Sequence, residues 1–228
     1  MRRAAAVAAV AALVASACAG EPAPGRLVRF STDDGVELAG DLRGSGPTGV
    51  VLAHMFPTDR ASWAEFGSLL ADRGYRSLAF DFRGYGASGG EREIPEIWRD
   101  VLAAAEELRD RGARRIVLVG ASMGGTAALI AAARSEVTGV VTLSAAGTFM
   151  GLTAPPEVLQ AVDEPKLFIA AQGDGSAAAT AQTFYDTASG AKRLEVVTGA
   201  DHGTDLLEGR QGETVRRVIL EFLSGLPG

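Results

Sequence analysis

A serine, an aspartate and a histidine in this chain have the types and surroundings that nucleophilic catalysis requires. Ser122 lies between Gly120 and Gly124 in the segment IVLVGASMGGTAA. An unassisted serine hydroxyl is a poor nucleophile, so it needs a base within hydrogen-bonding reach and a third group that orients this base. His202 in GADHG is the candidate base, and Asp174 in AAQGDG is the candidate acid. Along the chain the serine comes first, then the acid, then the histidine.

The residues around Ser122 predict a sharp turn between a strand and a helix. Residues 116–119 are aliphatic and typical of a short buried strand, and small, helix-forming residues run through 123–134. A side chain at Gly120 or Gly124 would keep the strand and the helix from approaching closely enough to form such a turn. The alternative interpretation is a glycine-rich turn whose serine only caps the helix.

Apolar segments and helical patterns alternate along the rest of the chain. Residues 27–32 and 36–43 alternate apolar and polar side chains around a DDG turn, which predicts an antiparallel hairpin at one edge of a sheet. The continuous apolar runs that follow predict buried parallel strands. These expected strands are 50–53, 76–82, 116–119, 137–144, 166–172 and 193–198. With helices between them, they predict an α/β fold with a mostly parallel, twisted sheet and helices on both faces.

Sheets of this kind bind ligands at the carboxyl ends of their strands. The polar residues that fall at or just beyond the expected strand ends are His54, Asp81, Ser122, Ser144, Asp174 and His202. Asp201 and Asp205 stay open as alternative acids, although a side chain next to His202 usually points away from it. His54 is interpreted as a structural residue that hydrogen-bonds its loop, and a second base is the alternative.

Longer motifs resemble those of a known family. HMFP at residues 54–57 looks like the first oxyanion loop of the α/β-hydrolases, and DFRGYGAS at 81–88 is similar to their Asp-x-Arg-Gly-x-Gly-x-Ser loop. GASMGG matches their nucleophile elbow, and AAQGD and GADHG fall where that family has its acid and its histidine. The resemblance covers essentially the whole chain after the N-terminal segment. Met55 and Ala171 depart from it, because the family usually has glycine at both positions.

The resemblance implies a role for each site residue. Ser122 would attack an acyl carbon, and His202 would take the serine proton and return it to the leaving group. Asp174 would hold the imidazole in the useful tautomer. The backbone N–H groups of Met123 and Phe56 would bind the oxyanion. No cofactor is implied, and no spacing of His, Cys and Asp residues suggests a metal site.

The segment after Ser144 predicts an open pocket. Many relatives insert a lid domain there, but residues 145–165 are too few for one. The expected pocket is therefore shallow, with apolar side chains around it. The expected lining residues are Met55, Phe56, Met123, Phe149, Met150 and Leu152. Asp81, Arg83 and Ser88 are expected to brace the glycine-rich loop beside the site.

Composition indicates one globular domain. Of the 228 residues, 47% are hydrophobic and 22% are charged, which is enough apolar material for one substantial core. The domain is expected to span residues 27–228. The formal net charge of -6, with no basic stripe, argues against nucleic acid as a partner.

The N-terminus has the pattern of an export signal. Two arginines precede an apolar run over residues 4–14, which is far shorter than the ~20 residues of a bilayer-spanning helix. Residues 1–17 are interpreted as a lipoprotein-type signal peptide, because ASAC resembles a lipobox with alanine in place of the usual leucine. Cys18 would then carry a lipid anchor, and 18–26 would be a tether. Ordinary cleavage after Ala17 or Ala19 is the alternative.

Together these features predict a hydrolase that works outside the cytoplasm, anchored at the outer face of a bacterial membrane or else secreted. The expected substrate is a small or medium acyl ester, cleaved through an acyl-enzyme by Ser122, His202 and Asp174. Peptidase, amidase or thioesterase activity on the same fold is an alternative. A catalytically silent domain that acts as an envelope binding protein is an alternative of another class.

Overall fold

The computed structural model describes residues 25–227 of the chain. The predicted signal peptide at 1–17, Cys18 and most of the 18–26 tether lie outside this range, so they stay predictions. Within the described residues, none of the helices has the length and apolar character needed to cross a membrane.

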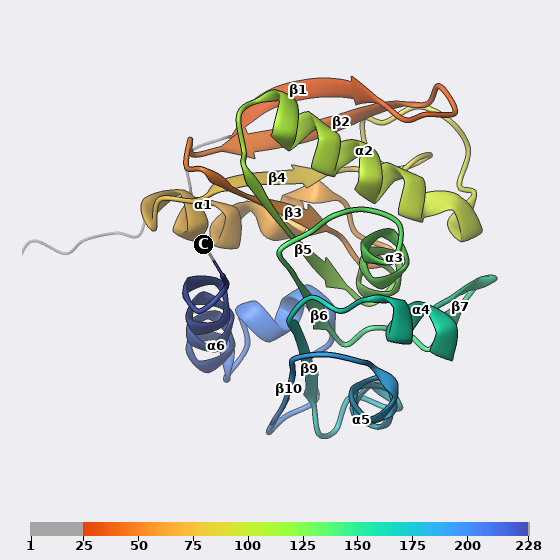
Figure 1. The fold of residues 1–228 in the computed structure, drawn as a ribbon, viewed down its shortest axis with the longest axis vertical. Helices are drawn as coiled ribbons and strands as arrows, with labels where there is room; N and C mark the ends of the chain where they lie inside the picture. The colour runs from red at the N-terminus through yellow and green to blue at the C-terminus, as the bar shows by residue number, and fades with distance from the viewer. Residues whose placement is uncertain (1–24, 228) are drawn as a thin grey trace, which may run out of the picture.

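An eight-stranded sheet forms the centre of the molecule (Figure 1). Its strand order is β1-β2-β4-β3-β5-β6-β9-β10. Strands β1 and β2 form an antiparallel hairpin, and β2 pairs antiparallel with β4. The other pairs in this sheet are parallel. This confirms the predicted sheet. The strands are β1 (Arg26–Ser31), β2 (Glu37–Arg43), β3 (Thr48–Ala53), β4 (Arg76–Phe80), β5 (Arg115–Ala121), β6 (Gly139–Leu143), β9 (Lys166–Ala171) and β10 (Lys192–Val197).

Helices cover both faces of the sheet, as predicted. Helices α2, α3, α4 and α5 pack on one face, and α1 and α6 pack on the other (Figure 1). Their bounds are α1 (Ala64–Asp72), α2 (Ile97–Asp110), α3 (Met123–Ala132), α4 (Pro156–Ala161), α5 (Ala177–Thr187) and α6 (Gly212–Ser224). The segment between β6 and β9 also contains a short hairpin that the sequence did not predict, formed by β7 (Thr148–Phe149) and β8 (Leu152–Thr153).

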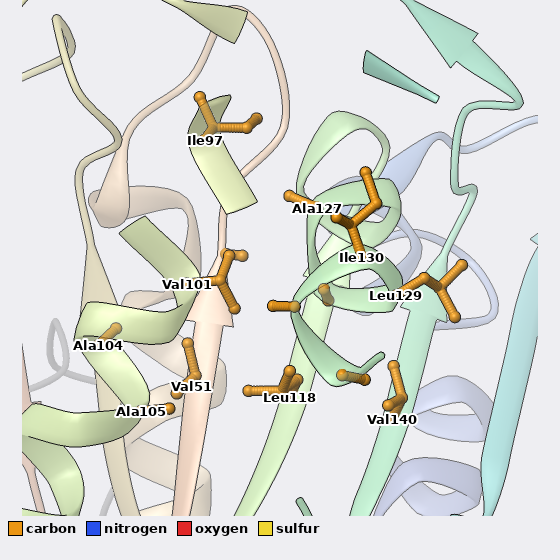
Figure 2. Close-up of a cluster of buried hydrophobic side chains, with 14 of the residues drawn as sticks. Val51, Ile97, Val101, Ala104, Ala105, Leu118, Ala127, Leu129, Ile130 and Val140 are labelled. Carbon is orange, nitrogen blue, oxygen red and sulfur yellow. The ribbon is translucent and has the colours of Figure 1, made fainter. Parts of the chain in front are cut away.

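The core has two layers because alternate residues of each central strand point to opposite faces. Val51 of β3 belongs to the layer under α2 and α3, whereas its neighbours Val50 and Leu52 belong to the layer under α1 and α6. Figure 2 shows Val51 together with Val101 of α2 and Leu118 of β5 in the first layer. All residues of α3 are buried, so the helix that follows Ser122 lies inside the molecule.

The glycine-rich loop after β4 is held by buried charges. Asp81 accepts hydrogen bonds from the backbone N–H groups of Arg60 and Ala87 at 2.9 and 2.8 Å. Arg83 is fully buried and donates to Asp100 at 2.9 Å and to Asp34 at 2.8 Å. The prediction that Asp81 and Arg83 brace this loop agrees with these contacts.

Two of the three carboxylates that pair with Arg83 differ in how they titrate. The hydrogen bond from Arg83 lowers the pKa of Asp34 to about 2. Asp100 is fully buried, and the loss of hydration raises its pKa to about 6 although it faces the same guanidinium. Because the pKa of Asp100 is higher in the folded protein than in the unfolded chain, the ionised carboxylate lowers the free energy of unfolding at neutral pH. The Arg83–Asp100 pair therefore fixes the path of the loop rather than adding to the stability of the fold.

We therefore expect a large penalty when only one partner of the buried pair is removed. Arg83→Met should lower the free energy of unfolding by about 3–5 kcal/mol, because it leaves the Asp100 carboxylate buried without a counter-charge. The double variant Arg83→Met/Asp100→Leu should recover much of this loss. Arg217→Ala, which breaks an exposed pair with Glu221, should cost less than about 1 kcal/mol. Urea unfolding measures all three, and equal losses in the single variants would contradict the expectation.

Candidate active site

Ser122 lies on a sharp turn between β5 and α3, with a strained backbone. Its φ of 49° and ψ of -116° lie in a region that residues with a side chain rarely adopt. A Cβ at Gly120 would overlap the carbonyl oxygen of Gly124, and a Cβ at Gly124 would lie 2.6 Å from the carbonyl oxygen of His54. The Ser122 side chain makes no capping hydrogen bond to α3, so the interpretation of this serine as a helix cap is wrong.

His202 and Asp174 form a hydrogen-bonded pair at the same edge of the sheet. His202 Nδ1 lies 2.8 Å from Asp174 Oδ2 and 2.9 Å from Oδ1. Asp174 follows β9, and His202 precedes the short 3-10 helix Gly203–Leu207. Among the described residues, the His202 side chain pairs with neither of the alternative acids. The carboxylate of Asp201 lies against Gly209 instead.

The His202 loop packs directly on the serine turn. A Cβ placed on Gly203 would lie 3.4 Å from the Cβ of Ala121, the residue before Ser122, and would overlap the sulfur of Met55. Gly203 has a φ of 57°, a backbone conformation that residues with a side chain rarely adopt. Gly203, the neighbour of His202, therefore lies beside the side chain of Ala121, the neighbour of Ser122.

The expected oxyanion donors lie at the N-terminus of α3 and in the loop after β3. Met123 is the first residue of α3, where a helix leaves its N–H groups without an intrahelical acceptor and where its dipole favours negative charge. Gly124 brings this helix end against the carbonyls of Ala53 and His54, close to Phe56. Within residues 25–227, the N–H groups of Met123 and Phe56 have no hydrogen-bond acceptor.

His54 acts as a structural tie between two loops. It is fully buried, its Nδ1 lies 2.9 Å from the carbonyl oxygen of Met55, and the N–H of Phe82 points at its Nε2 at 3.2 Å. A ring that donates from Nδ1 and accepts at Nε2 is neutral. Burial lowers the pKa of His54 below its usual value, which keeps it in that form. This arrangement fits the interpretation of His54 as a structural residue that hydrogen-bonds its loop. Both ring nitrogens are occupied by backbone groups, so neither is left to act as a base for Ser122.

The predicted apolar lining is divided between the opening and the core. The rings of Phe56 and Phe149 pack at 5.5 Å, which joins the loop after β3 to the β7–β8 hairpin. Met150, at the tip of this hairpin, is 67% exposed. Leu152 is only 1% exposed because it points under the hairpin into the core, so the prediction that it lines the pocket is wrong. Met55 is also mostly buried, against Gly203 and the α1–α6 layer.

A small cavity adjoins the Asp174–His202 pair, and the sequence did not predict it. Its volume is about 150 Å³, and its lining includes Ser144, Ser176 just before α5 and Thr180 in α5. Ser176 and Thr180 are four residues apart, which places their side chains on the same side at the start of α5. This spacing is the one local feature of the sequence that could have indicated the cavity. In the described part of the chain, no group of three or more His, Cys, Asp or Glu residues could hold a metal ion.

Comparisons with known proteins agree with this architecture. The family model described as alpha/beta hydrolase fold matches residues 49–185. The uncharacterized protein Rv2307c of Mycobacterium tuberculosis is 30% identical over 225 residues, which cover 86% of this chain and 80% of that protein.

Solved structures with the same fold include two hydrolases. The Pyrococcus furiosus esterase Pf2001 superposes with a TM-score of 0.74 at 20% identity, over 89% of this chain and 91% of that one. The dienelactone hydrolase of Anabaena variabilis also has a TM-score of 0.74, at 24% identity, over 91% of this chain and 100% of that one. At these identities the likeness concerns the fold.

The turn at Ser122 predicts a steric effect of substitution at Gly124. Gly124→Ala should lower the free energy of unfolding by about 1–3 kcal/mol, because the new methyl group meets rigid backbone atoms of β3 and its loop. Gly225→Ala is the control, since the nearest atom to a Cβ there lies at 3.4 Å and the backbone has a negative φ. Urea unfolding of both variants checks this, and equal stability would contradict it.

The buried neutral state of His54 predicts a dependence of stability on pH. Because its pKa is lowered in the folded state, the unfolded chain binds more protons as the pH falls below about 6.5. His54 therefore costs stability progressively below that pH, by at most about 1.4 kcal/mol per pH unit. His54→Asn should flatten the profile between pH 7.5 and 5 relative to the parent. The chain has 2 histidines, so His202→Asn is the matched control; a flattening found only there would contradict the assignment.

Proposed function

Because this chain belongs to the α/β-hydrolase fold family, we propose that it is a serine hydrolase that cleaves small or medium acyl esters through an acyl-enzyme. The observation that carries the proposal is the hydrogen bond between His202 and Asp174, in a loop that packs on the strained turn of Ser122. A base, its orienting acid and a serine hydroxyl at one sheet edge are the parts that acyl transfer needs.

In the proposed reaction, the Nδ1–H of His202 donates a hydrogen bond to the Asp174 carboxylate, which leaves Nε2 free to act as the base. His202 takes the proton of the Ser122 hydroxyl as its oxygen attacks the ester carbonyl. The negative charge that develops on the carbonyl oxygen is stabilised by the N–H groups of Met123 and Phe56. His202 then protonates the departing alcohol, and water releases the acid from Ser122 by the same steps.

The acyl group is proposed to lie across Phe56 and Phe149. These rings pack on each other beside the Phe56 N–H, and exposed Met150 extends the apolar surface. The described residues include no inserted lid domain, so a chain bound there would stay partly in water. This favours acyl groups of small or medium size. The same residues could attack an amide, but an ester has the better leaving group and is the substrate we propose.

The proposed location is outside the cytoplasm. It rests on the sequence of residues 1–17 and on Cys18 as a site for a lipid anchor. The fold carries no argument on this point.

The proposed roles predict how a fluorophosphonate, which modifies an activated serine, will react. The parent protein should gain one adduct by intact mass, Ser122→Ala should gain none, and Asp174→Asn should react about 10³–10⁴-fold more slowly because the imidazole loses its orientation. His202→Ala should be at least as slow. Ser135→Ala and Asp201→Asn are the matched controls and should react like the parent. An adduct that persists in Ser122→Ala would place the nucleophile elsewhere, and no adduct on the folded parent would favour a silent binding domain.

A further inference from the structure

We propose that the cavity beside His202 binds the alcohol part of the substrate, and that this alcohol is a small, uncharged polyol. The inference rests on the proposed function and specifies its substrate class. It starts from Ser144, a residue to which the reaction assigns no role.

The Ser144 hydroxyl is buried without a partner. Ser144 is 1% exposed, and its Oγ has no hydrogen-bond partner among the described residues. Its backbone N–H is satisfied by the carbonyl oxygen of Ile169 at 2.8 Å. An unpaired buried hydroxyl costs stability. Ser144 also has a φ of 51°, which makes it strained as well as unsatisfied.

The cavity that Ser144 lines is next to the reacting groups. His202 and Asp174 form one side of it. Ala146 forms another part, and its N–H points at the carbonyl oxygen of Ser122 at 3.4 Å. Because His202 must hand its proton to the departing oxygen, the alcohol has to lie on the His202 side of Ser122. The apolar rings of Phe56 and Phe149 are not part of the cavity lining, so the two sides of the ester meet surfaces of different character.

The lining offers hydroxyl groups at three points, between small alanine and glycine residues. Ser144, Ser176 and Thr180 each bring a hydroxyl that can both donate and accept. Among the described lining residues there is no lysine or arginine to pair with an anionic group, and Asp174 would repel one. A cavity of about 150 Å³ is the size that takes a compact molecule of about six heavy atoms. Glycerol has this size, and when it is esterified at one end it keeps two free hydroxyls.

The test compares esters that share an acid and differ in the alcohol: 1-butyrylglycerol, propyl butyrate and the butyryl ester of glycerol 3-phosphate. On the parent protein, kcat/KM for 1-butyrylglycerol should exceed that for each of the others by about 10-fold. Ser144→Ala and the isosteric Thr180→Val should each lower the ratio of the glycerol ester to propyl butyrate by about 3- to 5-fold, the effect of one lost hydrogen bond.

Matched controls separate a binding role from a structural one. Thr183→Val, on the exposed side of α5 where its hydroxyl bonds only to Ala179, should leave the ratio unchanged. Ser144→Ala should melt no lower than the parent, because it removes an unpaired hydroxyl. Ser77→Ala should melt lower, since the equally buried Ser77 hydroxyl is bonded to Gly67.

The results that would contradict the subsite differ from those that would contradict the proposed function. The polyol subsite is refuted if the parent cleaves the glycerol ester and propyl butyrate equally well or prefers the phosphate ester. It is also refuted if Thr183→Val changes the ratio as much as Thr180→Val does, or if Ser144→Ala clearly lowers the melting temperature. In each of these cases the fluorophosphonate still labels Ser122, so the proposed function stands. If no ester is cleaved and Ser122 is not labelled, the proposed function fails and the subsite fails with it.

Discussion

The close approach of α3 to the ends of β3 and β5 is the constraint on which the rest of the site depends. It is possible only because Gly120 and Gly124 have no side chains to separate these backbones. The same approach forces Ser122 into its positive φ. It also brings the N-terminus of α3 against the loop that carries Phe56. One steric requirement thus positions a hydroxyl and the two N–H groups that would stabilise charge beside it.

Polar contacts hold the surrounding loops at this edge, and they do so at a cost in stability. His54 ties the loop after β3 to Phe82, and Arg83 ties the loop after β4 to Asp100. Both histidine and carboxylate are fully buried, where ionisation is unfavourable. Hydrophobic residues could fill these spaces with less penalty. What they could not supply is directed hydrogen bonds that fix the path of a loop, which is what a site built on loop backbone requires.

The sequence predicted those parts of the molecule that local pattern determines. The strands of the sheet and the glycines around Ser122 depend on short-range periodicity and backbone sterics, and both could be read directly. The β7–β8 hairpin has strands of two residues, too short for any period to show. Leu152 and Met150 are close in sequence and similar in character, yet the turn between them directs one into the core and leaves the other in water. No local pattern separates such a pair, because tertiary packing decides it.

The strain in this molecule is concentrated where the chemistry is proposed. Within residues 25–227, the non-glycine residues with positive φ are Ser122, Ser144 and Met150. Ser122 and Ser144 follow the neighbouring parallel strands β5 and β6, and Met150 is at the tip of the hairpin beyond them. A fold selected only for stability would place glycine at these turns. The strain at Ser122 is explained by the tight turn that Gly120 and Gly124 allow. Ser144, just after the next strand, has a similar positive φ and also an unpaired buried hydroxyl. Both features lower stability, and a role for this serine in binding the substrate would explain why they are kept.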